Sequence, residues 1–175
     1  MESPGSKLSF YDVFRIWMEP HRMSYKSRVV WFLFLNFSLL AVGSIFTGDA
    51  LQNDDWYKKL NRAPWEPPGW VFGFAWVTIM ICFSYYLAGL FAEKSPTNNI
   101  FLTSCLALNT LWSPLFFAGH QVGLALVVMV LLDLLIWFKF ITEMRQRKKR
   151  AFLLLPYSLW LLIATSLNVW VLAMN

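Results

Sequence analysis

Residues 56–70 of the chain, WYKKLNRAPWEPPGW, lie between the first two long apolar runs of the sequence. The stretch combines three tryptophans, a tyrosine and three prolines with Lys58, Lys59, Arg62 and Glu66, so it is neither a membrane span nor an ordinary polar linker. The prolines fix φ, remove backbone donors and favour extended geometry in the residues before them. Its aromatic rings need an apolar surface, and such rings are enriched at the membrane–water boundary. The stretch is therefore predicted to be a stiff loop that folds over a helix bundle as a lid.

The composition of the whole chain favours a bilayer. Of its 175 residues, 58% are hydrophobic, 18% aromatic and only 14% charged, which is more apolar surface than a soluble domain of this size could enclose. A hydrocarbon core requires ~20 apolar residues per helix. Runs close to that length occupy residues 29–46, 70–91, 100–118, 122–141 and 151–174. The predicted fold class is all-α: a polytopic membrane protein with a single bundle of five transmembrane helices and the first loop as its lid.

The first 28 residues differ from the rest and are predicted to form a basic amphipathic extension, with residues 29–175 as the transmembrane domain. Phe10, Phe14, Trp17 and Met18 follow helical spacing, which predicts a short helix lying on the membrane surface. The segment lacks the apolar core and cleavage site of a signal peptide, and its acidic residues argue against a mitochondrial presequence.

Basic residues are distributed unevenly between the two ends of the predicted bundle. The extension and the second and fourth connections carry most of them, whereas the other end has only Lys58, Lys59 and Arg62. By the positive-inside rule the first end is cytoplasmic if the membrane is a bacterial cell membrane. In the eukaryotic alternatives, the mitochondrial outer membrane or another organelle membrane, the rule is weaker and does not assign the sides. The run RQRKKR at 145–150 is interpreted as a topology signal that contacts lipid headgroups, not as a nucleic-acid site.

Three of the predicted spans carry inward-facing stripes of aromatic and polar residues at helical spacing. An amide exposed to lipid would be costly to desolvate, so Asn109 and Asn168 should face into the bundle together with their stripes. The stripes are Phe72, Trp76, Met80, Phe83 and Leu87; Cys105, Asn109, Trp112 and Phe116; and Tyr157, Trp160, Ala164 and Asn168. A single stripe is more often helix packing, but three under an aromatic lid predict a pocket for a large, flat, mostly apolar ligand.

The first loop and two of the stripes resemble the TspO/MBR family of tryptophan-rich sensory proteins and mitochondrial translocator proteins. The resemblance extends from residue 29 to residue 175. It is carried by Trp56, Tyr57, Leu60, Pro64, Trp65, Pro67, Pro68 and Trp70 in the loop, by Asn109, Trp112, Pro114, Phe116 and Phe117 in the third span, and by Pro156, Tyr157, Trp160, Ala164 and Asn168 in the fifth.

The resemblance implies a cavity beneath the first loop that binds tetrapyrroles such as protoporphyrin IX and haem, aromatic drugs and sterols, with the porphyrin as ligand and no cofactor. It matches the family's cavity tryptophans to Trp76 and Trp160 and a small residue to Ala164. It also implies a homodimer formed through the third span, where Thr103 and Ala107 make a small-xxx-small pair. The predicted ligand contacts are Trp56, Trp65, Trp76, Met80, Phe83, Asn109, Trp112, Tyr157, Trp160, Ala164 and Asn168.

Two features depart from the family pattern. The family commonly has an acid where this chain has Val128, and Asp133 lies five residues on; it is interpreted either as a functional residue or as one that pairs within the bundle. The residues after Ala164 lack the tyrosine and the basic residue of the sterol motif, which lowers the expectation of tight cholesterol binding.

The sequence shows no metal-ligand cluster, nucleophile–base pair or phosphate-binding loop. His120 is interpreted as a solvated turn residue, and Cys82 and Cys105 as small buried hydrophobes. A binding protein that is not an enzyme is therefore predicted. The alternative implied by bacterial members is light-dependent oxidative degradation of protoporphyrin beside Trp76 and Trp160, and a third possibility is a scaffold for partner proteins.

Overall fold

The computed structural model describes residues 20–146 and 148–175, and all the regular secondary structure in these ranges is helical. Five of the helical segments there are long and apolar enough to cross a membrane, which confirms the predicted five-span fold. The elements are η1 (Pro20–Arg22), α2 (Tyr25–Asn53), α3 (Asp55–Lys59), α4 (Gly69–Leu90), α5 (Pro96–Ser113), η2 (Pro114–Ala118), α6 (Val122–Arg145), η3 (Lys149–Leu154) and α7 (Leu155–Met174).

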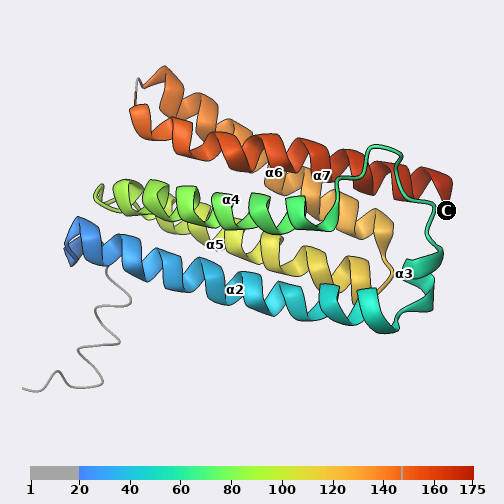
Figure 1. The fold of residues 1–175 in the computed structure, drawn as a ribbon. Helices are drawn as coiled ribbons and strands as arrows, with labels where there is room; N and C mark the ends of the chain where they lie inside the picture. The colour runs from blue at the N-terminus through green and yellow to red at the C-terminus, as the bar shows by residue number, and fades with distance from the viewer. Residues whose placement is uncertain (1–19, 147) are drawn as a thin grey trace, which may run out of the picture.

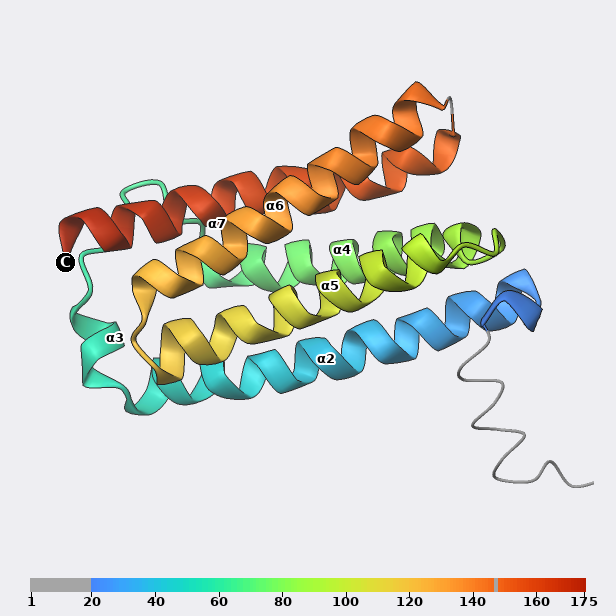
Figure 2. The same cartoon turned by 180° about the vertical axis from the view of Figure 1, so that it is seen from behind.

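The five long helices lie side by side in one bundle (Figures 1 and 2). Helix α2 packs on α4 and α5, and α6 packs on α5 and α7. The start of α2, the α4–α5 connection and the α6–α7 connection lie at one end, while α3, the loop after it and the end of α7 lie at the other (Figure 1). This arrangement puts the predicted basic connections together and leaves the first loop at the opposite end.

Local sequence signals account for several helix ends. Ser24 caps α2 by accepting a hydrogen bond from the Ser27 amide at 3.2 Å. Pro96 and Pro156 stand in the first turns of α5 and α7, where a proline costs no intrahelical hydrogen bond. Pro114 begins the π-helical turn η2, in which Gly119 N donates to Pro114 O at 2.8 Å.

Helix α2 is longer than the predicted span 29–46, since it runs from Tyr25 to Asn53. Hydropathy marks only the part of a helix that crosses hydrocarbon, and the polar turns at either end of α2 continue the same hydrogen-bonded ladder. Residues 25–28 of the predicted extension thus belong to the first helix. The predicted surface helix at Phe10, Phe14, Trp17 and Met18 lies outside the described residues.

The core of the bundle is apolar, with Phe32, Tyr86 and Ile136 fully enclosed. Large apolar side chains also cover the outside; Phe138, for example, is 69% exposed. So much outward apolar surface is abnormal for a soluble monomer and normal for helices that face lipid. Both cysteines are free thiols; Cys105 is buried, as predicted, whereas Cys82 is only partly buried.

An ionic cluster, here called the Arg150 cluster, joins α4, α6 and η3 at the end opposite the first loop. Arg150 donates from Nε and Nη2 to the two carboxylate oxygens of Glu143, at 2.8 and 3.1 Å, and from Nη1 to Gly89 O at 2.9 Å. Glu143 is only 3% exposed. At the outer side Glu93 contacts Arg150 Nη2 and Lys148 Nζ, each at 3.0 Å. The cluster therefore satisfies a buried carboxylate and fixes this end of the bundle.

Candidate functional site

The first loop begins with the short helix α3, which Asp54 caps. Asp54 Oδ1 accepts hydrogen bonds from the amides of Trp56 at 2.8 Å and Tyr57 at 3.4 Å. The cap orients the two rings toward the π-helical turn η2, where Trp56 packs at 6.0 Å from Phe116 and Tyr57 at 5.3 Å from Phe117. Helix α3 is thus held against the end of α5 by four aromatic rings.

After α3 the loop runs across α7 and is attached to it at two places (Figure 1). Asn61 N donates to Asn175 Oδ1 at 2.8 Å, and Asn175 Nδ2 donates back to Asn61 O at 3.5 Å. Trp65 Nε1 donates to Ser166 Oγ at 3.1 Å, and its ring meets Trp170 edge-on at 5.1 Å. The loop is therefore the lid that the sequence predicts, held on α7 by polar contacts at its exposed side.

His120 provides the third attachment of the lid. Its Nε2 lies 2.8 Å from Asp54 Oδ2, and its ring stacks on Trp56 with centroids 4.1 Å apart. The backbone φ of 51° turns the chain sharply between η2 and α6. The interpretation of His120 as a solvated turn residue is therefore incomplete, because it is a turn residue that also binds the lid.

We expect the His120→Asn variant to loosen α3. Asparagine tolerates the positive φ, but it removes the ring that stacks on Trp56 and pairs with Asp54. Backbone amides of residues 55–60 should then exchange hydrogen faster, as hydrogen-exchange mass spectrometry can measure. The Gln121→Ala variant, which changes an exposed neighbour in the same turn, should exchange like the parent; equal exchange in the parent and His120→Asn would contradict the attachment.

Lowering the pH should also loosen the contact between His120 and Asp54. Desolvation is the largest single cause and would raise the pKa of Asp54, but the hydrogen bonds from His120 and from the Trp56 and Tyr57 amides together outweigh it and hold that pKa below its usual value of 3.8. A carboxylate whose pKa is depressed in the fold stabilises that fold above its unfolded pKa, and the stabilisation is lost as pH falls through the folded value. The protection of residues 55–60, which is the exchange rate measured relative to the intrinsic rate of the unfolded chain at the same pH, should accordingly fall below pH 3.8.

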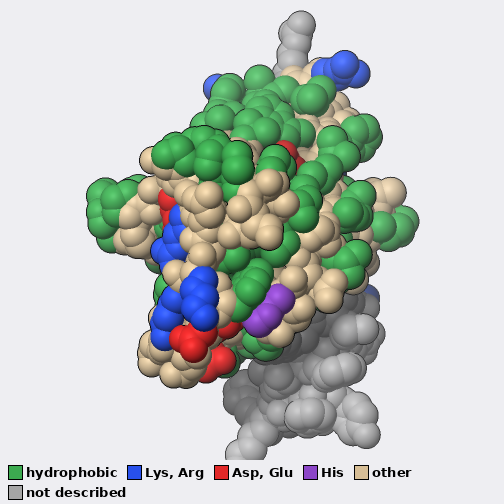
Figure 3. Space-filling view, turned by 90° about the vertical axis from the view of Figure 1, so that its right-hand side faces the viewer, with side chains coloured by type: hydrophobic (Ala, Val, Ile, Leu, Met, Phe, Trp, Pro, Cys, Tyr) green, Lys and Arg blue, Asp and Glu red, His purple; other side chains and the backbone are tan. Residues whose placement is uncertain are grey.

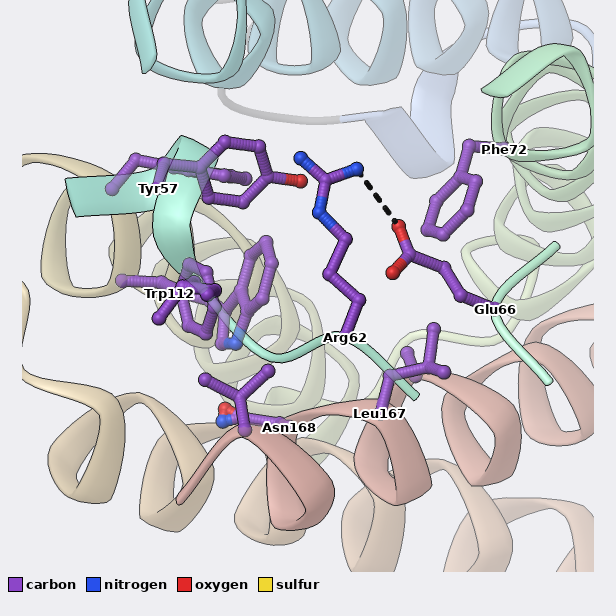
Figure 4. Close-up of a pocket in the computed structure, with 12 residues that line it drawn as sticks. Tyr57, Arg62, Glu66, Phe72, Trp112, Leu167 and Asn168 are labelled. Carbon is purple, nitrogen blue, oxygen red and sulfur yellow. Dashed lines mark ion pairs between the residues drawn. The ribbon is translucent and has the colours of Figure 1, made fainter. Parts of the chain in front are cut away.

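A cavity of about 90 Å³ lies beneath the lid (Figure 4). Trp112 and Phe116 stack with centroids 5.1 Å apart along one wall, and Phe117 meets Trp112 edge-on at 5.6 Å. The wide turn of η2 rotates successive residues by less than the about 100° of an α-helix, so both phenylalanines can line the same space. The lining residues are Tyr57, Leu60, Arg62, Glu66, Phe72, Trp112, Phe116, Phe117, Ala164, Leu167, Asn168 and Val171.

Four polar groups border this mostly apolar space. At the mouth, Arg62 lies 4.7 Å above the Tyr57 ring and 3.7 Å from Glu66 Oε1. On the inner wall, Asn168 Nδ2 donates to Val122 O at 3.3 Å. Asn168 Oδ1 and Trp112 Nε1 are buried without a hydrogen-bond partner among the described residues. The cavity thus has a cation at its mouth, whereas the two unpaired polar atoms of its inner wall are enclosed by the protein.

Three of the predicted contact residues line the cavity, namely Trp112, Ala164 and Asn168. Trp160 lies behind them, 5.1 Å from Phe72, and Tyr157 donates to Asn109 Oδ1 at 3.2 Å. The apolar core holds five of the predicted contacts, Trp76, Met80, Phe83, Tyr157 and Trp160, and Asn109 is hydrogen-bonded to this core through Tyr157. Trp56 and Trp65 belong to the lid's attachments. The inward orientation of the stripes is confirmed, and the contact of these residues with a ligand stays a prediction.

Sequence reasoning missed the charged pair at the mouth. Arg62 and Glu66 were noted only as charges that exclude a membrane span. The turn closed by Glu66 N and Ala63 O, at 2.9 Å, brings the two side chains to one side of the loop. Opposite charges at the two sides of a proline-bearing turn were the available signal.

Asp133 does not border the cavity. It lies on α6, half-buried, and its Oδ1 has no hydrogen-bond partner among the described residues. Neither the functional nor the pairing interpretation of this acid gains support, and both stay predictions. Val128, where the family commonly has an acid, is buried in the bundle. Across the described residues, no group of three or more His, Cys, Asp or Glu side chains is placed to hold a metal ion.

Comparison with known proteins agrees with these features. Residues 31–174 match the sequence profile of the TspO/MBR family. The chain is 33% identical to a tryptophan-rich sensory protein of Cereibacter sphaeroides over 83% of this chain and 92% of the relative. It is 37% identical to the human translocator protein over 74% of this chain and 80% of the relative. It is also 33% identical to the tryptophan-rich protein TspO of Archaeoglobus fulgidus, over 79% of this chain and 94% of the relative.

Proposed function

The chain belongs to the TspO/MBR family of integral, multi-pass membrane proteins, and on that premise we propose that it is a receptor- or translocator-like protein that binds porphyrins. The proposed ligands are protoporphyrin IX and haem, and the proposed site is the cavity beneath the first loop. The observation that supports this most directly is the aromatic wall in which Trp112 and Phe116 stack and Phe117 meets them edge-on. Flat aromatic ligands gain from such rings in a desolvated pocket.

The size of the cavity implies that binding requires the lid to move. Pockets for drug-sized ligands measure roughly 300–1,000 Å³, whereas this cavity measures about 90 Å³. The attachments of the lid are a His–Asp contact, an Asn–Asn pair and a Trp–Ser hydrogen bond, all at exposed positions. Contacts of this kind open with little cost, so the lid belongs to the low-stability part of the fold.

The test is a titration of the purified protein in nanodiscs with protoporphyrin IX, followed by absorption and by tryptophan fluorescence. We expect saturable binding at one site per chain and a reversible complex in the dark. A pure scaffold for partner proteins predicts no saturable binding. Cholesterol is added as a competitor in the same titration, because the mostly apolar lining of the cavity also suits a sterol.

A second candidate function is light-dependent degradation of the bound porphyrin. It is favoured by the position of Trp160, whose ring contacts Phe72 and so lies one side chain away from the cavity. The same titration, repeated under illumination, separates the two functions. A new protein-dependent absorption band that free porphyrin does not develop would favour the enzyme over the receptor.

The protein is also proposed to form a homodimer through α5. Thr103 and Ala107 lie on its outward face, both exposed, where small side chains allow another helix to approach closely. The Ala107→Phe variant should weaken dimerisation by about tenfold, as native mass spectrometry in mild detergents can measure. Val127→Phe on the lipid-facing side of α6 is the matched control. A parent chain that is monomeric in detergents and in nanodiscs would contradict the proposal.

A further inference from the structure

We propose that the outer side of α2 binds one anionic phospholipid, with the phosphate at Lys26 and Arg28 and an acyl chain along Val30 and Phe34. This site lies where α2 begins, at the end of the bundle opposite the lid, and shares no residue with the cavity (Figure 1). The inference therefore goes beyond the proposed function and does not depend on it. Its ligand is a membrane lipid with net negative charge.

A groove of about 540 Å³ lies along the first turns of α2, and its lining changes from polar to apolar along the helix. Its residues, in chain order, are Met23, Lys26, Ser27, Val30, Trp31 and Phe34. Val30 and Phe34 are 66% and 62% exposed, so the apolar part lies on the outside of the bundle. From Lys26 to Phe34 the helix advances about 12 Å. A polar end at the membrane surface and an apolar end within the hydrocarbon match the two parts of a phospholipid.

Lys26 gives the polar end of the groove a positive charge that is not neutralised by the described residues. Its side chain is exposed and forms no ion pair with any of them. The described acids at this end, Glu93 and Glu143, both belong to the Arg150 cluster. A lysine in this position attracts an anionic headgroup.

Arg28 is a second cation without a counter-charge, and it is buried. Its side chain is 7% exposed; Nε donates to Ala88 O at 2.8 Å and Nη1 donates to Met23 O at 2.7 Å. These carbonyls satisfy hydrogen bonds but carry no charge, and no described carboxylate forms an ion pair with Arg28. A buried charge without an opposite charge is costly. Because Met23 also lines the groove, a phosphate at the polar end would supply negative charge close to this guanidinium.

The backbone of α2 has the same electrostatic preference. The first N–H groups of a helix have no partner within it, and Ser24 Oγ accepts one of them, from Ser27. The helix dipole places partial positive charge at this end of α2. The dipole does not select a lipid by itself, but it adds to the attraction that Lys26 and Arg28 exert on a phosphate.

The two ends of the bundle differ in charge, and the groove lies at the basic one. The described connections and helix ends there carry two acids, Glu93 and Glu143, and eight basic residues: Arg22, Lys26, Arg28, Lys94, Arg145, Lys148, Lys149 and Arg150. From Asp54 to Glu66 the lid has three acidic and three basic residues. Figure 3 views the lid end and shows Lys and Arg side chains beside Asp and Glu side chains. Lys59, exposed on this balanced end, is therefore a matched control for Lys26.

The shape and charge of the groove favour a lipid over other occupants. A soluble phosphate would contact only the polar end and would gain nothing from Val30 and Phe34. A second copy of this chain, packed on the groove through the same surface, would bring two basic ends together, and like charges across an interface repel. An anionic lipid supplies both the negative charge and the acyl chain.

The experiment measures which lipid stays on the full-length protein. Native mass spectrometry is recorded on protein released from nanodiscs that contain equal amounts of phosphatidylglycerol and phosphatidylcholine with the same acyl chains. The parent should retain one phosphatidylglycerol in preference to phosphatidylcholine. Lys26→Gln should lower this preference about fivefold, the contribution of one basic residue at a membrane surface. Lys59→Gln should keep the preference of the parent.

Two further pairs of variants test the apolar part and the buried cation. Val30→Trp fills the groove from an exposed position and should lower retention of phosphatidylglycerol about tenfold, whereas Val127→Trp, on the lipid-facing side of α6, should not. Arg28→Gln should lower the preference for phosphatidylglycerol, and Arg28→Lys, which keeps the charge, should restore most of it. Thermal unfolding in phosphatidylcholine nanodiscs shows whether each variant is folded.

Four results would overturn the inference. Equal retention of the two lipids by the parent removes the charge preference, and equal losses in Lys26→Gln and Lys59→Gln make it a general effect of charge. Displacement of phosphatidylglycerol by inorganic phosphate, at constant ionic strength, means that the site takes a soluble phosphate. Unchanged retention by Val30→Trp means that the lipid does not lie in the groove, which is then covered by residues 1–19 or by a second copy. Porphyrin titrations of these variants should match the parent, so the proposed function is tested separately.

Discussion

The Ala164→Phe variant should bind protoporphyrin IX at least tenfold more weakly than the parent, a loss of about 1.4 kcal/mol or more. Ala164 lines the cavity from α7, one turn after Trp160. A phenyl group there would occupy most of a space that measures about 90 Å³. A flat ligand could then enter only by displacing the new ring together with the lid. The measurement is the same porphyrin titration in nanodiscs.

The control for this variant changes the opposite face of the same helix. Leu162 is 48% exposed on the lipid-facing side of α7, so Leu162→Phe should leave the affinity unchanged. Overpacking can cost ~1–3 kcal/mol of stability, so the thermal unfolding of both variants has to be recorded as well. If the Ala164→Phe protein is folded and binds porphyrin as tightly as the parent, the cavity is not the binding site.

The Arg150→Met variant should destabilise the protein by about 3 kcal/mol, the cost typical of removing one partner from a buried ion pair. The methionine fills similar volume but leaves the Glu143 carboxylate, 3% exposed, without its two strong hydrogen bonds. Lys139 Nζ, at 3.7 Å, is a weaker partner that would remain beside it. Reversible unfolding in mixed detergent micelles measures the change in free energy.

Two further variants distinguish this cost from a general loss of charge. Lys148→Met removes a cation that pairs with the half-exposed Glu93, and exposed pairs contribute ~0–1 kcal/mol, so its effect should be small. The double variant Glu143→Gln with Arg150→Met removes both members of the buried pair and should recover part of the loss. Equal destabilisation by Lys148→Met and Arg150→Met would show that burial does not set the cost.

The helices and their inward faces could be predicted because their signals are local. Each span is a continuous apolar run, and positions such as Trp160 and Asn168 repeat at the helical period. Both residues are buried, at 5% and 2% exposure, as their spacing predicts. The cost of exposing an amide to lipid was sufficient to orient α5 and α7 without any knowledge of their neighbours.

The attachments of the lid could not be predicted in this way. His120 and Asp54 are 66 residues apart, and Asn61 and Asn175 are 114 residues apart. No periodic pattern links residues at such separations, because the pairing depends on how the helices are arranged. Trp65 shows the same limit. The composition of the first loop predicts a lid, but the hydrogen bond from Trp65 to Ser166 places this side chain against α7 and outside the cavity lining.

Because its helices cross the bilayer, the molecule has two ends in two different aqueous compartments. The lid and its Arg62 are exposed to one compartment, and the Arg150 cluster is exposed to the other. A change of salt concentration or pH on one side of the bilayer therefore acts on one of these ends, and the solution around the other end is unchanged. A partner protein that is confined to one compartment can therefore contact the lid or the Arg150 cluster, but not both.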